Sequence, residues 1–368
     1  MNEFKTLALT LSETQTAELT ALYDQMQHTM ERRYFLPSEQ YDKLRAAMRK
    51  TLEAQEGWIA IEKQADSHHT LLRLTSADNR LLNLPWRLAV AHDARLYLSC
   101  DVQEAREGGI FEPQTASPLK ILVMVSAPDD SHGGARLDYE TEEKKIIEAF
   151  SPLFRHGQVQ IDFTDDGSLE SLEAKLKANR YHILHFSGHG VFDAEGQMGE
   201  KKPNTGYLLL EDARTLGSQL VSARAFARAI SVRSDQCPDL VLLSSCQTAQ
   251  GGASEGGFTG VANKLLNAGV PAVVAMGFSI LDPFASLFAA ELYRQLAEKE
   301  ELPQSFHLAL NPLRGAEADF ARQGGGLPSQ WLIPQLYLRQ QVNKLVNWTA
   351  PDQKLVFKSA KFATGEAR

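Results

Sequence analysis

The sequence predicts an α/β fold with a mostly parallel central sheet, and three observations support this class. Continuous aliphatic runs, of which residues 121–125 are the clearest, are typical of strands buried on both faces of a parallel sheet. Amphipathic segments alternate with such runs from residue 119 onward. A chain of 368 residues is also long enough for one large α/β domain and a smaller unit.

The amino-terminal third has a different pattern. Residues 1–65 have helical periodicity, and helices are expected from Ser12 to Tyr34 and from Ser38 to Leu52. Small β-elements are expected between Thr70 and Cys100, including residues 81–84. A linker rich in Gly, Glu and Pro follows.

The elements after this linker are expected in a largely alternating order. Strands are predicted at residues 121–125, 158–163, 182–187, 207–210, 239–245 and 271–276, and within 331–338. Helices are predicted at residues 139–150, 168–178, 222–230, 257–267 and 283–297. The chain is thus divided into an amino-terminal region of helices and small β-elements at 1–117, an α/β domain at 118–340 and a basic tail at 341–368.

Composition excludes several classes of function. The net charge is −8 and no basic stripe is interleaved with aromatic residues, so direct nucleic-acid binding is not expected. The longest nearly apolar run, Ala268 to Ile280, is too short to span a bilayer, and Met1 to Leu22 lacks the pattern of an export signal. Three cysteines form no even disulfide framework and suit a reducing cytoplasm.

Two apolar runs each end in a reactive side chain. Residues 181–187 lead into Gly188-His189-Gly190, and residues 240–243 lead into Ser244-Ser245-Cys246. Because the carboxyl ends of parallel strands meet at one edge of a sheet, an imidazole and a thiol are expected side by side there. Such an imidazole can take the proton of a thiol and later donate one to a leaving amine.

This pattern gives each residue a role. Cys246 is the candidate nucleophile and His189 the candidate general base and acid, and the backbone N–H groups of Gly190 and Cys246 are expected to bind the oxyanion. A lone cysteine after an apolar run is usually a small buried hydrophobe, and a lone histidine at a strand end is usually structural. Both together at strand exits favour a function.

Other polar residues near these strand ends allow more than one interpretation. Asp193 could polarise the imidazole or lie in an exposed turn. A zinc site of His182, His185, His189 and Cys246 is disfavoured, because a strand directs residues 182 and 185 to opposite faces. No metal and no cofactor are expected, and His185 is expected to pack within the sheet.

A glycine-rich stretch at residues 251–257 follows the candidate nucleophile and contains Glu255. It lacks the Gly-Lys-Ser/Thr ending of a phosphate-binding loop, so nucleotide binding is not expected. A mobile loop that shapes a substrate cleft is the preferred interpretation. Ser187, Ser244, Asp193 and Glu255 are therefore candidate substrate-binding residues.

The sequence resembles the CHAT family of caspase-like cysteine proteases. The matching motifs are His185 to Gly190, Leu240 to Thr248, Leu84-Pro85-Trp86-Arg87, Val123 to Pro128, Tyr207 to Asp212 and Trp331 to Tyr337. They follow the order of the family over roughly residues 70–340. Of the two α/β arrangements that the alternation allows, doubly wound and caspase-like, the resemblance implies the caspase-like three-layer α/β/α sandwich, with the smaller helical and β region in front.

The resemblance also implies a setting. Such proteases act in prokaryotic host defence or regulated cell death, where they cut a partner protein after a trigger. The expected partners are a protein substrate, such as a pore-forming or other defence effector encoded nearby, and an activating protein that contacts the amino-terminal region. Neither a nucleic acid nor a membrane is an expected partner.

The chain departs from the related families at one informative position. In caspases and metacaspases a Gln or Asp two places before the cysteine helps to bind a charged substrate residue, whereas this chain has Ser244. Cleavage after a neutral or apolar residue is therefore expected, unless Glu255 or Glu211 lines the pocket. The alternatives to an endopeptidase are a catalytically silent interaction or scaffold module, and a transacylase or other hydrolase with the same dyad.

Overall fold

The structure, a computed structural model, describes most of the chain. The described residues are 3–33, 37–65, 70–82, 84–90, 96–102, 110–113, 118–128, 144, 147–148, 159–193, 195–202, 205–215, 217–231, 237–245, 257–277, 280, 282–322 and 329–347. Several expectations fall elsewhere. Cys246, Glu255, most of the helix expected at 139–150 and the last part of the basic tail lie outside the described residues.

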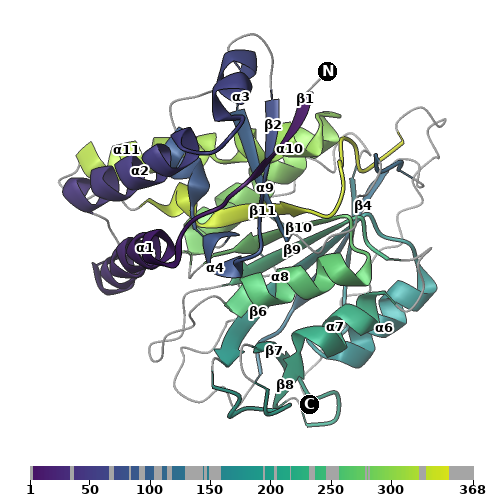
Figure 1. The fold of residues 1–368 in the computed structure, drawn as a ribbon. Helices are drawn as coiled ribbons and strands as arrows, with labels where there is room; N and C mark the ends of the chain where they lie inside the picture. The colour runs from purple at the N-terminus through teal and green to yellow at the C-terminus, as the bar shows by residue number, and fades with distance from the viewer. Residues whose placement is uncertain are drawn as a thin grey trace.

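The strands form one mixed sheet of eleven members in the part of the chain that the structure describes. They are β1 (Glu3–Ala8), β2 (Thr70–Ser76), β3 (Leu96–Val102), β4 (Leu119–Val125), β5 (Val159–Phe163), β6 (Ile183–Asp193), β7 (Thr205–Glu211), β8 (Ser218–Ser222), β9 (Leu240–Ser245), β10 (Ala272–Met276) and β11 (Pro334–Leu338). Their order is β1-β2-β3-β11-β10-β9-β6-β4-β5, and β7 and β8 extend from β6 (Figure 1). Most pairs are parallel, whereas β10–β11, β6–β7 and β7–β8 are antiparallel.

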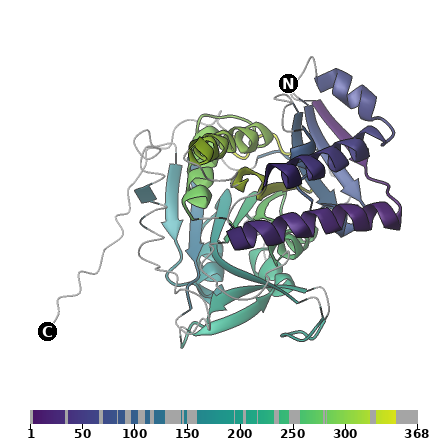
Figure 2. The same ribbon diagram turned by 90° about the vertical axis from the view of Figure 1, so that its left-hand side faces the viewer.

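The helices surround this sheet (Figures 1 and 2). They are α1 (Glu13–Arg33), α2 (Ser38–Glu53), α3 (Trp58–Ala65), α4 (Asn79–Leu82), η1 (Trp86–Val90), α6 (Leu169–Ala178), α7 (Ala223–Ile230), α8 (Gly257–Ala268), α9 (Asp282–Ala297), α10 (Leu302–Ala309), α11 (Asn311–Arg322) and η2 (Gln330–Leu332). None of the described helices is long and apolar enough to cross a membrane.

Neighbouring residues of β6 demonstrate the three layers. Phe186 packs edge-on against Phe226 of α7, with ring centroids 5.8 Å apart. The preceding residue, His185, packs against Tyr293 of α9, with ring centroids 6.0 Å apart. Because successive side chains of a strand point to opposite faces, α7 and α9 cover opposite faces of the sheet. The predicted α/β fold with a mostly parallel sheet between helical layers is confirmed.

The amino-terminal expectation needs two corrections. Residues 3–8 form strand β1, which pairs in parallel with β2 along its whole length, instead of a helix. Leu7 and Leu9 are buried, so pairing and burial on alternate residues outweigh the local helical preference. Residues 81–84, expected to be β, fall mainly in the short helix α4, and Trp86 to Val90 form η1.

Strand β8 and helices α10 and α11 were also not predicted. Strand β8 follows a turn, and α10 and α11 lie between the expected helix at 283–297 and the last strand. The signal for the two helices was present, because Leu302, Phe306, Leu310 and Leu313 recur at three- and four-residue intervals and are all buried. Helix α10 also has proline in its first turn, as helix starts often do.

The sheet and the core both cross the expected domain boundaries. Strand β3 pairs with β11 through Cys100 and Tyr337, which joins the amino-terminal strands to the rest of the sheet. Beyond residue 341, Val342, Leu345 and Val346 are buried, so ordered packing continues into the start of the expected tail. The division into regulatory region, α/β domain and tail stays a prediction.

Candidate functional site

The candidate site lies at the edge where the parallel strands β4, β6, β9 and β10 end. Strand β4 ends at Val125 and β9 at Ser245, whereas β6 continues to Asp193 and pairs in this extension with β7. His189 lies in the extension, directly opposite Leu209 of β7, and is half-buried. The backbone of the candidate base is therefore held in a ladder while its residue remains partly open to solvent.

The register between β6 and β9 brings the two candidate motifs to the same place. Ser187 lies opposite Ser244, and Gly188 lies opposite Ser245. Gly188 is the residue before His189 in the sequence, and Ser245 is the residue before Cys246. Both motifs therefore reach this edge of the sheet in register, up to the last described residue of β9.

Gly188 has no room for a side chain. A Cβ atom at this position would lie 2.6 Å from Cζ of Phe186 and 3.3 Å from the carbonyl oxygen of Ser126. The Phe186 ring is itself fixed, because it is fully buried and packs on α7. The glycine before the candidate imidazole is therefore required mainly by the fixed Phe186 ring, with the Ser126 carbonyl oxygen also close.

Ser187 and Ser244 are buried between their neighbours in the sheet, with exposed fractions of 0% and 4%. Ser126, at the end of β4, donates its backbone N–H to the Ser187 carbonyl at 2.8 Å and its hydroxyl to the Leu209 carbonyl at 3.0 Å. Ser126 thus links the end of β4 to β6, which carries the candidate base, and to β7, which pairs with β6 there. A substrate role for Ser187 and Ser244 stays a prediction.

Asp193 closes the loop that follows β6. Its carboxylate accepts hydrogen bonds from the backbone N–H groups of Gly196, Gln197 and Met198, at 2.8, 3.0 and 2.7 Å. Desolvation would raise the pKa of this carboxyl, but the backbone hydrogen bonds outweigh it and the net pKa is lowered. The group therefore serves the loop backbone, and its expected roles toward the imidazole or the substrate stay predictions.

His185 packs within the sheet, as expected. It is 3% exposed, and its Nδ1 lies 3.1 Å from the hydroxyl of Tyr293. Burial lowers the pKa of His185 to about 4, so this imidazole is neutral at physiological pH. Among the residues that the structure describes, no three His, Cys, Asp or Glu side chains are grouped to hold a metal ion.

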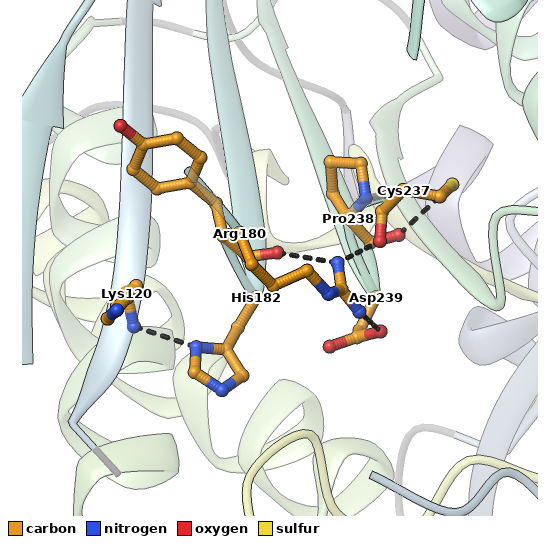
Figure 3. Close-up of polar contacts among 7 residues, drawn as sticks. Lys120, Arg180, His182, Cys237, Pro238 and Asp239 are labelled. Carbon is orange, nitrogen blue, oxygen red and sulfur yellow. Dashed lines mark hydrogen bonds and ion pairs between the residues drawn. The ribbon is translucent and has the colours of Figure 1, made fainter. Parts of the chain in front are cut away.

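A second polar cluster lies at the opposite, amino-terminal edge of these strands (Figure 3). His182 accepts the backbone N–H of Lys120 through Nδ1 at 2.9 Å, and Arg180 pairs with the carboxylate of Asp239 at 2.5 Å. Cys237 is buried here, and burial raises the pKa of its thiol to about 11. This thiol is therefore not an activated nucleophile.

Glu211, at the end of β7, has a structural role. The sequence alone indicated only that it could line the substrate pocket. Its buried carboxylate accepts the backbone N–H of Ala127 at 2.9 Å and that of Gly167 at 3.0 Å. A Cβ at Gly167 would lie only 2.7 Å from the Ser126 Cα atom, which explains the glycine. The Glu211 carboxylate thus joins β4, β7 and the segment before α6.

Comparisons with known proteins agree with the resemblance seen in the sequence. A profile of the CHAT domain matches residues 19–350. Among solved structures, the Saccharomyces cerevisiae separase–securin complex is similar over 89% of this chain, at 14% identity and a TM-score of 0.39. This chain spans about a fifth of that separase chain, with 22% covered.

Two further solved structures are also similar to this chain. A second structure of the separase–securin complex is 11% identical over 89% of this chain and 23% of its own, with a TM-score of 0.38. The Arg-specific cysteine proteinase gingipain R is 8% identical over 94% of this chain and 79% of its own, with a TM-score of 0.46. No curated protein matches the sequence significantly.

Proposed function

The chain belongs to the CHAT domain family, and from this premise we propose that it is a cysteine endopeptidase. In this proposal, Cys246 is the nucleophile and His189 is the general base and acid. The substrate is a partner protein in a prokaryotic defence or cell-death pathway in the cytoplasm. An activating protein partner relieves a restraint through the amino-terminal region.

The pairing of β6 with β9 is the observation that carries the proposal. Gly188 and Ser245 lie opposite each other, and neighbouring strands are about 4.8 Å apart. Peptide bonds keep the next Cα atoms, those of His189 and Cys246, within about 3.8 Å of this pair. One residue after this opposed pair, the sequence has His189 following Gly188 and Cys246 following Ser245.

The chemistry follows from these two groups. The imidazole of His189 takes the proton of the Cys246 thiol, and the thiolate attacks the carbonyl carbon of the scissile peptide bond. The backbone N–H groups of Gly190 and Cys246 stabilise the resulting oxyanion. The imidazolium then gives its proton to the leaving amine as the C–N bond breaks, and water hydrolyses the thioester and restores the thiol.

The polar residues near the site favour a neutral or apolar residue before the scissile bond. Ser244 provides no charge where caspases and metacaspases have a Gln or Asp. The carboxylate of Glu211 is buried and accepts the backbone N–H groups of Ala127 and Gly167, so we expect it to serve the backbone and not a substrate residue. Glu255 is the remaining acidic residue that could select a charge.

Peptide profiling with matched variants tests the proposal. A proteome-derived peptide library is incubated with the parent, Cys246→Ala, His189→Ala, Cys237→Ala and His28→Ala, alone and after co-expression with the products of neighbouring genes. His28 is exposed on α1 and Cys237 lies at the far edge of the strands, so both serve as controls. We expect new termini after neutral or apolar residues with the parent and both controls, and none with the first two variants.

Two results would contradict the peptidase proposal. Cleavage that persists in both Cys246→Ala and His189→Ala would exclude the dyad. A parent that binds a neighbouring gene product and cleaves neither it nor any library peptide would instead support a catalytically silent interaction module.

A further inference from the structure

The hairpin of β7 and β8 carries an exposed surface that the proposed chemistry does not use. His189, Leu209 and Leu220 lie opposite one another on β6, β7 and β8. Directly opposite residues of antiparallel strands project to the same face of the sheet. Leu220 is 43% exposed and Leu209 is half-buried, so apolar surface extends from the candidate base to the edge of the hairpin.

The other face of the hairpin is covered. Leu208 and Val221 lie opposite each other, and both are buried, with exposed fractions of 0% and 5%. Helix α7 packs on β7 and β8, and α8 packs on β7. The hairpin is therefore supported from one side by the folded core while its other side, with Leu220, faces solvent.

Strand β8 is also an edge strand. It pairs with β7, and in the described part of the chain no strand pairs with its other side. Ser218, Gln219 and Leu220 are exposed along it. An edge of this kind can accept an extended peptide as an additional strand through backbone hydrogen bonds.

A basic recess lies where β8 leads into α7. It has a volume of about 400 Å³ and is lined by Glu200, Lys202, Arg224, Ala225 and Arg228. Arg224 and Arg228 are exposed one helical turn apart on α7, and the described residues contain no ion pair with either.

The one carboxylate of the recess is already engaged. Glu200 accepts the hydroxyl of Ser222 at 2.6 Å and lies 4.0 Å from the Lys202 ammonium. The recess therefore has an excess of positive charge on a chain whose net charge is −8. Such a local reversal of sign favours a negatively charged ligand in the recess.

We propose that the β8 edge and this basic recess form a docking site for an extended segment of the protein substrate, with an apolar side chain at Leu220 and acidic side chains in the recess. The inference rests on the proposed function and names a substrate feature outside the scissile bond. Leu220 lies two strand spacings from His189, roughly 10 Å, so the docking segment lies a few residues from the cleaved bond. The strand edge and exposed leucine favour a peptide over a nucleic acid.

Fluorescence anisotropy tests the site in the Cys246→Ala background, where cleavage cannot affect the reading. The probe is a fluorescein-labelled peptide in which one leucine is followed by a run of glutamates, and its matched control has lysines in place of the glutamates. We expect the glutamate peptide alone to bind, with an affinity that falls as salt is added. Arg224→Glu with Arg228→Glu should weaken it about tenfold or more, and Leu220→Ser should weaken it severalfold.

Control variants separate docking from folding. Lys43→Glu with Lys63→Glu introduces the same charge change at exposed positions of α2 and α3 and should leave binding unchanged. Unfolding midpoints of all variants are measured to show that each is folded. Equal binding by the parent and the Arg224/Arg228 variant, equal binding of both peptides, or no binding at all would overturn the docking site. Arginine-dependent binding of a single-stranded oligonucleotide without binding of the glutamate peptide would overturn it too.

The docking site and the peptidase proposal can fail separately. Library cleavage without glutamate-peptide binding rejects only the docking site, and binding by Cys246→Ala does not require any peptidase activity.

Discussion

At the scale of residues, two histidines on one strand have different environments. His185 is enclosed by the sheet and α9 and has a hydrogen-bonding partner in Tyr293, whereas His189 lies half-buried where β6 leaves the sheet. A buried imidazole with a lowered pKa stays neutral and cannot cycle protons near pH 7, but one near solvent can. Their positions along β6 thus give His185 a packing role and leave His189 for the proposed chemical role.

His185 should make the protein sensitive to acid. Its pKa is about 4 in the folded state and 6.5 in the unfolded state, so the unfolded state binds more protons between these values. The stability contribution is therefore complete above pH 6.5 and is lost as the pH falls toward 4, by an amount on the order of 3 kcal/mol.

Denaturant unfolding at a series of pH values measures this contribution. The free energy of unfolding of His185→Gln should fall less between pH 6.5 and 4 than that of the parent, and exposed His28→Gln should follow the parent. Parallel pH profiles for the parent and His185→Gln would contradict the assignment.

At the scale of elements, one carboxylate organises the strand ends beside the site. Glu211 joins β7 to the end of β4 and to Gly167, and Ser126 links the same end of β4 to the carbonyl of Leu209, opposite His189. These contacts are made by backbone groups of residues far apart in the sequence. No local pattern could have predicted them.

Glu211→Ala should therefore destabilise the protein and slow cleavage. The buried N–H group of Gly167 and the partly buried one of Ala127 lose their acceptor, which costs roughly 1–3 kcal/mol in the free energy of unfolding. Glu173→Ala removes a surface ion pair with Lys177 and should cost less than about 0.5 kcal/mol. Equal unfolding free energies for these two variants would contradict a structural role for Glu211.

The same distinction explains which elements the sequence predicted. The aliphatic runs at β4, β6, β9 and β10 predict these strands from sequence alone, because strands buried on both faces need continuous apolar residues. Strands β1 and β8 contain no such continuous apolar run, so their pairing with β2 and β7 decides their structure. At the site, the two apolar runs that lead to His189 and to Cys246 can be found in the sequence. The roles of Glu211, Ser126 and Gly167 depend on tertiary contacts and cannot.

At the scale of the whole molecule, the amino-terminal region and the α/β domain are joined by more than a linker. The buried guanidinium of Arg87 donates to the carbonyl oxygens of Trp331 and Pro334, at 3.0 and 2.7 Å, and lies 4.8 Å from the centroid of the Phe306 ring. Pro334 lies opposite Met276, at the carboxyl end of β10. Arg87 therefore links the amino-terminal region to the segment that pairs with the carboxyl end of β10.

Arg87→Met should weaken this junction strongly. It leaves two buried carbonyl groups without their donor, which should lower the free energy of unfolding by roughly 2–4 kcal/mol. Arg45→Met, which removes an exposed pair with Asp42, should change it by less than about 1 kcal/mol. Denaturant unfolding compares the two, and a loss at Arg87 no larger than that at Arg45 would argue against the junction.

The most direct measurement of the central claim is the rate at which iodoacetamide alkylates Cys246, followed by mass spectrometry across pH in the parent and in His189→Ala. If the imidazole activates this thiol, the parent should react at about pH 6, and the variant should react at least about tenfold more slowly there. Cys237, whose thiol pKa is raised to about 11 by burial, should stay unmodified in both and serves as the internal reference. The same rate and pH profile at Cys246 in both proteins would contradict the dyad.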